Sequence, residues 1–169
     1  MKIKNISQFK LHTLRRKGFT IVEVVLVIGI IAIVSVVALI NLSGRKGTSQ
    51  LDGTVRQISS LIREAQSKSV SQVGGATWGV VFDNTTTSEP FYGMFKGASY
   101  TATTSVSYYR LPANIAYATS TIAGGSKVEI YFLQISGLPS ATATIGLALQ
   151  SPDSPSSTIS VNSSGAVSF

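Results

Sequence analysis

The sequence contains no cysteine and one histidine, His12, and only 12 % of its 169 residues are charged. The lack of cysteine excludes disulfides, thiolate nucleophiles and cysteine-bound zinc. His12 lies within the first 18 residues, so a chain that had lost them would have no imidazole for general base catalysis or metal binding. A Gly-x-x-x-x-Gly-Lys-Ser/Thr string is also missing, because Gly124-Gly125-Ser126-Lys127 lacks its spacing. We therefore expect no enzyme activity, no cofactor and no metal.

Acidic residues are missing from the N-terminus. The first 18 positions carry no acid and six basic residues: Lys2, Lys4, Lys10, Arg15, Arg16 and Lys17. From Phe19 onward, eight Lys or Arg face seven Asp or Glu, so this part has a net charge of +1 although the whole chain has +7. One net charge is too little for a broad phosphate-tracking surface. The basicity is therefore a property of the N-terminus.

A long apolar run follows the basic segment. Residues 19–42 carry one charge, Glu23, and as a helix would span about 36 Å, which is enough for a bilayer core. We predict a transmembrane helix over 19–42. More basic residues precede it than follow it, so we expect a cytoplasmic N-terminus and an extracytoplasmic remainder. Residues 41–45 make a poor cleavage site for a secretory signal peptide, so the run should stay in the mature protein.

Glu23 needs a reason, because a carboxylate deep in hydrocarbon costs about 2.5 to 3.5 kcal/mol on insertion scales. One interpretation is that Glu23 lies within a turn of the start of the run, where it reaches the interface and meets the positive end of the helix dipole. The other is that Glu23 pairs with a cation on a neighbouring subunit. Attraction of about 4 kcal/mol at 4 Å and an effective dielectric near 20 would offset its desolvation. The second interpretation predicts an oligomer built on this helix.

The residues around the start of the run read Arg15-Arg16-Lys17-Gly18-Phe19-Thr20-Ile21-Val22-Glu23. This string resembles the processing site of type IV prepilins and type II secretion pseudopilins. Their sites combine basic residues, Gly, Phe, Thr, two aliphatic residues and Glu, and a long apolar helix follows. Such a site places the cut before the apolar segment, unlike other export signals. The resemblance covers residues 15–42 and divides the N-terminal part into a cleaved leader, 1–18, and an assembly helix, 19–42.

The resemblance implies how the protein is processed and which proteins it interacts with. A membrane prepilin peptidase would cleave after Gly18 and methylate the new amino group of Phe19. Glu23 would then pair with the Phe19 amine of the adjacent subunit. The implied partners are this peptidase, other pilins or pseudopilins, and an inner-membrane platform with its ATPase, which acts indirectly. The alternative is a signal-anchored protein with an accidental Gly18–Phe19 junction and an uncleaved leader.

Residues 43–72 are predicted to form a linker and an amphipathic helix. Apolar residues recur at mostly three- and four-residue spacing: Leu51, Val55, Ile58, Leu61, Ile62, Ala65 and Val70. We expect this stripe to pack against a sheet. Gly44, Gly47 and Gly53 together cost a few kcal/mol of helix propensity, so we expect a bend, a flexible joint or a conditional helix there.

Residues 73–169 are predicted to form a β-rich head. Short strands are expected at 77–82, 91–95, 127–133, 143–150, 158–161 and 166–169. The last two flank the turn Asn162-Ser163-Ser164-Gly165, which predicts a terminal hairpin. The Thr-, Ser- and Gly-rich stretches at 83–90, 97–107 and 118–126 are expected to be surface loops or edge strands.

The predicted fold class is α+β and pilin-like, with a long N-terminal transmembrane helix and a small antiparallel head. Within this class, residues 62–70, 74–82 and 159–169 resemble the minor pseudopilins related to GspH and FimT. Many major pilins have a proline where this chain has Ile40, and many have a C-terminal disulfide. This chain lacks both the proline and the disulfide, and this favours a minor subunit of a type II secretion pseudopilus or type IV pilus. A major pilin, or a DNA-binding minor pilin of a competence system, remains the alternative.

The head holds candidate residues for two ligands, calcium and DNA. Asp83, Asn84, Thr85 and Glu89 carry oxygens that calcium accepts, but their spacing matches no EF-hand loop, so a polar turn is expected. Asp153, between two prolines, is interpreted in the same way. For DNA, Arg110 and Lys96 with Tyr108 and Tyr109 are the candidate patch, while the 42 residues after Lys127 hold no Lys or Arg. We expect no nucleic-acid partner.

Overall fold

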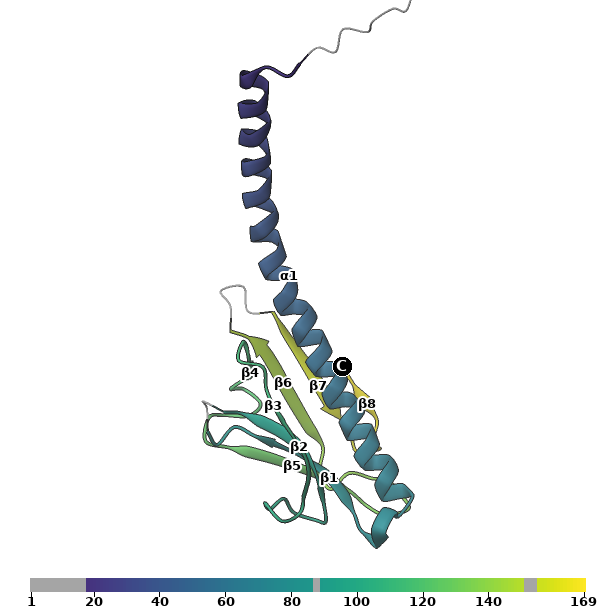
Figure 1. Cartoon of the computed structure of the whole chain (residues 1–169). Coiled ribbons are helices and arrows are strands. Elements are labelled where there is room, and N and C mark those ends of the chain that lie inside the picture. The colour runs from purple at the N-terminus through teal and green to yellow at the C-terminus, as the bar shows by residue number, and fades with distance from the viewer. Residues whose placement is uncertain (1–17, 87–88, 151–154) are drawn as a thin grey trace, which may run out of the picture. The chain divides into compact units, whose positions relative to one another are not determined.

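The computed structural model of the chain describes residues 18–86, 89–150 and 155–169, without the side chains of residues 37–45. The predicted leader charges Arg15, Arg16 and Lys17, and also Asp153, lie outside the described residues. The chain forms two compact units, Met1–Asn41 and Leu42–Phe169, and we call the second the globular unit. Helix α1 (Ile21–Val70) contributes residues to both units (Figure 1).

The globular unit contains two four-stranded antiparallel sheets. Their strand orders are β3-β2-β1-β5 and β4-β6-β7-β8 (Figure 1). The strands of the first sheet are β1 (Trp78–Asp83), β2 (Phe91–Lys96), β3 (Ser105–Arg110) and β5 (Lys127–Phe132). Those of the second are β4 (Ile115–Tyr117), β6 (Ala143–Leu149), β7 (Ser156–Val161) and β8 (Val167–Ser168). The 3-10 helix η1 (Val73–Gly75) links α1 to β1.

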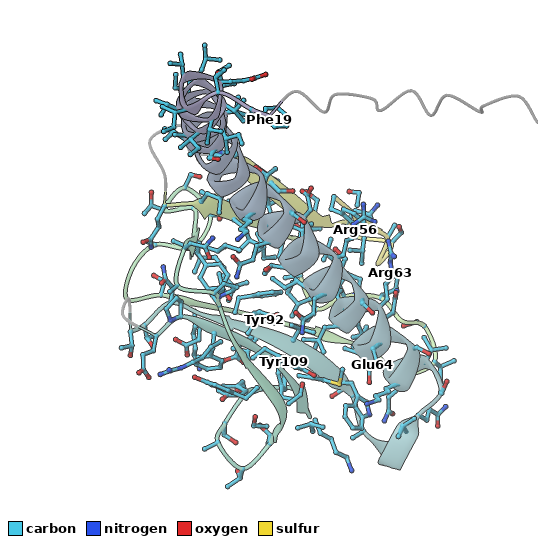
Figure 2. All side chains as sticks on the ribbon, turned by 45° about the horizontal axis from the view of Figure 1, so that its top comes forward. Phe19, Arg56, Arg63, Glu64, Tyr92 and Tyr109 are labelled. Atoms are coloured by element: carbon cyan, nitrogen blue, oxygen red, sulfur yellow. The ribbon has the colours of Figure 1, made fainter. Side chains whose placement is uncertain are left out.

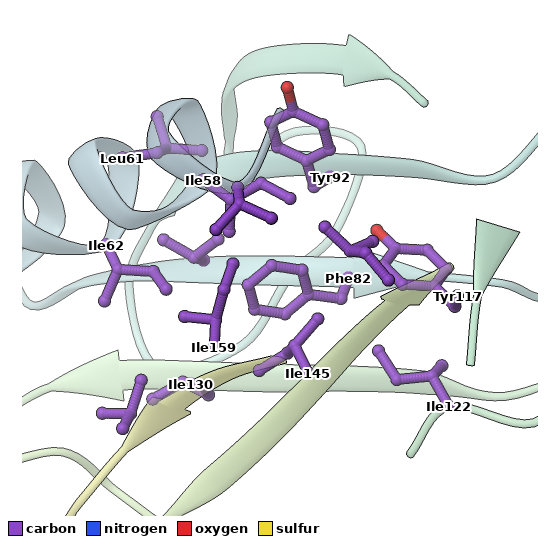
Figure 3. Close-up of a cluster of buried hydrophobic side chains, with 14 of the residues drawn as sticks. Ile58, Leu61, Ile62, Phe82, Tyr92, Tyr117, Ile122, Ile130, Ile145 and Ile159 are labelled. Atoms are coloured by element: carbon purple, nitrogen blue, oxygen red, sulfur yellow. The ribbon is translucent and has the colours of Figure 1, made fainter. Parts of the chain in front are cut away.

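One hydrophobic core joins the helix and the two sheets. Ile58, Leu61 and Ile62 of α1 meet side chains from both sheets (Figure 3). Among these, Phe82 and Ile130 belong to the first sheet, and Ile145 and Ile159 to the second. All buried members of this core lie between Leu51 and Val161. The core is therefore complete within the globular unit.

Strand β1 is buried at all six positions because both of its faces are covered. Alternate side chains point into the core, as strand geometry requires. On the other face, Val81 and Phe95 are fully buried outside that core. The segment 97–104 covers this face: the Tyr100 ring lies 6.0 Å from that of Phe95, and the Tyr100 amide donates to Glu129 Oε2 at 3.0 Å. A loop thus closes the outer face of the first sheet.

The predicted amphipathic helix is confirmed up to Val70, and its stripe packs against the sheets. Val70 itself is an exception, since it is 43 % exposed. The glycines do not end the helix, because α1 continues through Gly44, Gly47 and Gly53. A Cβ on Gly47 would lie 3.2 Å from Leu149 Cδ1, so the helix passes close to β6 there. Tertiary packing outweighs the weak propensity of these residues.

The six predicted strands are present, with ends shifted by at most two residues. The terminal hairpin is also confirmed, because β7 and β8 pair across residues 162–166. Two further strands are present. β3 begins in the stretch 97–107, which was predicted as a surface loop or an edge strand, and it is an edge strand that extends to Arg110. β4 is three residues long and was not predicted. Both form through pairing with β2 and β6, and short strands of mixed composition carry little periodic signal.

Two glycines predict opposite changes in stability. A Cβ on Gly93 of β2 would collide with the backbone oxygen of Ser107, whereas Gly53 has open space in the helix. We expect Gly93→Ala to lower the free energy of unfolding by about 1–3 kcal/mol through overpacking. Gly53→Ala should raise it by about 0.5–1 kcal/mol through helix propensity. Urea unfolding of residues 42–169 measures both, and equal midpoints for the two variants would contradict the packing described here.

Candidate assembly site at the helix N-terminus

Thr20 caps the start of α1. Its Oγ1 accepts a hydrogen bond from the Glu23 amide at 3.2 Å, and its carbonyl oxygen accepts one from the Val24 amide at 3.2 Å. A Thr three residues before a Glu is the sequence of a capping box, of which the Thr half is formed here. The role of Thr20 was missed at the sequence level, although the Thr-x-x-Glu spacing was there to be read. The cap sets the first turn of the helix directly after Gly18 and Phe19.

Phe19 and Glu23 lie on the same side of this first turn. Together with Val24, Val27 and Ile28 they line a shallow hollow of about 270 Å³. Phe19 is 82 % exposed (Figure 2). The carboxylate of Glu23 sits in the first turn, where the helix dipole favours negative charge. The structure therefore brings together two of the predicted site residues.

Gly18 precedes the helix in an exposed position. A Cβ placed on it would meet no atom within 4 Å. Packing within the described structure therefore does not require glycine at this position.

The first turns of α1 present an apolar surface. Every residue from Ile21 to Val36 is exposed, and Glu23 is the one charged residue among them. The predicted transmembrane segment 19–42 ends in residues whose side chains lie outside the described part. Among the residues that the structure describes, no helix is long and apolar enough to span a membrane.

The oxygens considered for calcium are used in a turn. Asp83 Oδ1 accepts from the amide of Thr85 at 2.8 Å and from its hydroxyl, and Asn84 Nδ2 donates to the Ile122 carbonyl at 3.0 Å. Glu89 pairs with Arg110. Among the described residues, no group of three or more His, Cys, Asp or Glu side chains is placed to hold a metal ion.

The two basic residues considered for DNA lie far apart. Arg110 is opposite Phe91 at the start of β2, and Lys96 is at its end, about 17 Å away at 3.4 Å per residue. Arg110 also pairs with Glu89, and its hydrogen bond and positive charge hold the pKa of Glu89 below its usual range. Arg110 and Lys96 therefore do not form one patch with Tyr108 and Tyr109.

Four other basic residues of the globular unit contact aromatic or acidic side chains. Arg56 and Arg63 of α1 each lie about 6 Å from the centre of the Phe169 ring (Figure 2). Lys68 pairs with Glu64 at 2.8 Å, and Lys127 with Glu129 at 2.7 Å. Among the described residues, these two ion pairs neutralise Lys68 and Lys127 locally, so neither adds an unpaired charge to a surface that could track phosphates.

Comparison with known proteins points to the N-terminus. Residues 13–39 match the family defined by the prokaryotic N-terminal methylation motif, and this range includes Gly18, Phe19 and Glu23. No curated protein is significantly similar to the chain. No solved structure is significantly similar to it either.

The motif match supports the resemblance to the type IV pilin-like superfamily. It indicates a prepilin-type N-terminus of the kind that a prepilin peptidase processes. The motif also implies that the protein is anchored in a membrane and assembles with other pilins. Proteins with this motif are structural subunits rather than enzymes. The described helix and antiparallel sheets agree with the predicted α+β class.

Proposed function

We propose that this chain is a minor pseudopilin or pilin-like structural subunit of a type II secretion pseudopilus or type IV pilus. The match of residues 13–39 to the methylation motif carries this proposal. The precursor is cut after Gly18, the new N-terminus at Phe19 is methylated, and the helix 19–42 anchors the chain before assembly. The N-terminus is cytoplasmic and the globular unit is extracytoplasmic. A membrane platform and its ATPase drive assembly indirectly.

The charges explain why cleavage and assembly are linked. Removal of the leader takes away six positive charges and leaves one ammonium on Phe19, directly before the helix cap at Thr20. A cation at a helix N-terminus is unfavourable, because it meets the positive end of the dipole. The carboxylate of Glu23 on an adjacent subunit neutralises it. At about 4 Å and an effective dielectric near 20, this attraction is about 4 kcal/mol.

A minor role is favoured over that of a major pilin. The chain has no cysteine for the C-terminal disulfide found in many major pilins, and Ile40 stands where many of them have proline. The likeness of residues 62–70, 74–82 and 159–169 to proteins related to GspH and FimT supports the same choice. The separation of Arg110 from Lys96 gives no support to DNA binding.

The intact mass of the protein from its native membrane, with fragmentation of its N-terminus, tests the proposal. We expect a chain that begins at N-methylated Phe19 and is lighter by the mass of residues 1–18, apart from the added methyl group. Retention of residues 1–18 in cells whose other prepilins are processed would reduce the protein to a signal-anchored domain. The assembly role of Glu23 would be lost with it.

A further inference from the structure

The pattern Asn-x-Ser/Thr occurs four times in the sequence, with Asn5, Asn41, Asn84 and Asn162 as its asparagines. When x is not proline, this pattern is the acceptor for N-glycosylation in surface loops of exported proteins. The modification attaches a bulky, hydrated saccharide, so the asparagine must be exposed. Under the proposed function, Asn5 belongs to the cleaved leader and Asn41 to the membrane helix. Asn84 and Asn162 are the two candidates in the globular unit.

The structure excludes Asn84 as an acceptor. The residue is only 7 % exposed, and its Nδ2 donates to the Ile122 carbonyl at 3.0 Å. Its backbone is also held on both sides, because its amide donates to the Ser126 carbonyl at 2.9 Å and its carbonyl accepts from the Gly125 amide at 2.8 Å. A saccharide on Nδ2 would remove a buried hydrogen bond and would have to displace packed atoms. Asn84 is therefore an internal comparison, with the same pattern but without the exposure.

Asn162 begins the turn of the terminal hairpin, where Asn162, Ser163 and Ser164 are all exposed. Its Oδ1 accepts hydrogen bonds from the Ser164 amide at 3.0 Å, the Ser164 hydroxyl at 2.7 Å and the Ala166 amide at 2.9 Å. These bonds hold the oxygen of the side-chain amide against the turn. Within the part of the chain that the structure describes, no residue is hydrogen-bonded to Nδ2, the other end of that amide. The turn therefore leaves Nδ2 of Asn162 accessible.

The hydroxyl of Ser164 also prepares Asn162 for reaction. An amide nitrogen is a weak nucleophile, and it becomes a stronger one when it loses a proton. Loss of a proton from Nδ2 places negative charge on Oδ1, and the three donors at that atom stabilise this charge. One of those donors is the hydroxyl at the third position of the pattern. The Ser/Thr of the pattern thus has a physical role in this turn.

The globular unit itself holds the turn in this conformation. Gly165 has a φ of +81°, and a Cβ on it would collide with Nε2 of Gln66 in α1. Gln66 Nε2 also donates to the Gly137 carbonyl at 2.9 Å, in a turn that is strained at Ile135, whose φ is +65°. The hairpin turn is thus packed against the helix at Gly165, which is buried, while residues 162–164 are exposed.

We propose that Asn162 is N-glycosylated at Nδ2. The donor is a saccharide whose anomeric carbon is bonded to a phosphate leaving group. A bond forms from Nδ2 to the anomeric carbon, the bond from that carbon to the phosphate oxygen breaks, and the oxygen keeps its electron pair. The proton lost from Nδ2 passes to a base of the transferase, so no oxidant or reductant is needed. The inference rests on the proposed function in one respect, because the acceptor must lie on the extracytoplasmic side.

Peptide mapping of the full-length protein from its native membrane tests the proposal. Trypsin cuts after Lys and Arg, and Lys127 is the last such residue, so peptide 128–169 contains Asn162 and no other copy of the pattern. Asn84 lies in a separate peptide, 69–96. We expect fragmentation to place a saccharide on Asn162 in the first peptide and to find the second peptide unmodified. An unmodified Asn162, or a saccharide on a hydroxyl of that peptide instead, would overturn the proposal.

Two serines of the same turn provide matched variants. Ser164→Ala is expected to lose the saccharide, because it removes the hydroxyl that donates to Oδ1, whereas Ser164→Thr keeps a hydroxyl and should keep the saccharide. Ser163→Ala removes an exposed hydroxyl one position earlier and should also keep it. Full modification of Ser164→Ala, or equal loss in Ser163→Ala, would contradict the role given to the third position.

The same digest keeps this result separate from the proposed function. The saccharide adds to the intact mass expected from cleavage and methylation, so the N-terminus is determined from its own peptide. That peptide begins at methylated Phe19 in a processed chain and at Gly18, after Lys17, in an uncut one. A chain that begins at Phe19 but has an unmodified Asn162 would overturn only this inference. A modified Asn162 in a chain that retains Gly18 would overturn the proposed processing and leave this inference standing.

Discussion

Gly18→Val is expected to leave the leader attached to nearly all of the protein. Valine adds a branched side chain beside the bond between Gly18 and Phe19, where we propose that the peptidase cuts. Slowing by about a hundredfold would correspond to a barrier about 2.7 kcal/mol higher. The described structure itself accommodates the change, since a Cβ on Gly18 has no neighbour within 4 Å. Intact mass of the membrane protein measures the cleaved fraction.

Gly29→Ala is the matched control. Gly29 lies inside the helix, and a Cβ there also meets no atom within 4 Å. The variant should be processed like the natural protein, because its helix propensity improves and the cleavage site is unchanged. A Gly18→Val protein that begins at Phe19 would show that glycine is not needed for processing. An equal loss of cleavage in both variants would point to a general effect on membrane insertion.

Glu23→Gln and Glu23→Ala are expected to be inserted and cleaved almost normally but to fail in assembly. Each removes the negative charge that we propose pairs with the Phe19 ammonium of an adjacent subunit. Loss of about 4 kcal/mol at that contact would weaken it by about a thousandfold. Glutamine keeps the size of the side chain, so a shared loss in the two variants assigns the effect to charge. The filament yield after shearing measures assembly, and intact mass measures cleavage.

Glu64→Ala provides a control with the same loss of charge. Glu64 forms an exposed pair with Lys68 one helical turn away, which is worth about 0.3–0.5 kcal/mol (Figure 2). This variant should assemble normally. An unaltered filament yield in Glu23→Gln would contradict the pairing hypothesis. The remaining interpretation would be that Glu23 is tolerated because it lies near the helix start.

The geometry of the candidate assembly site could be predicted from residue order because it is local. Thr20 and Glu23 are three positions apart, and one helical turn brings them together whatever the rest of the chain does. Phe19, two residues before the helix begins, lines the same hollow as Glu23, which is only four residues further along the chain. The sites in the globular unit could not be predicted in this way. Whether Arg110 and Lys96 are neighbours depends on their positions along a sheet, and strand pairing places them at opposite ends of β2.

The sequence by itself determined the elements whose pattern is periodic or local: the basic N-terminus, the apolar run, the motif around Gly18, the helical stripe from Leu51 and most strands. The tertiary structure decided what depends on distant partners. It brought β3 and β4 into the sheets through pairing with β2 and β6. It also left Val70, the last residue of the stripe, exposed beside the strained turn at Ile135. Periodicity shows which face of a helix is apolar, but only packing shows how far along that face the sheets bury its residues.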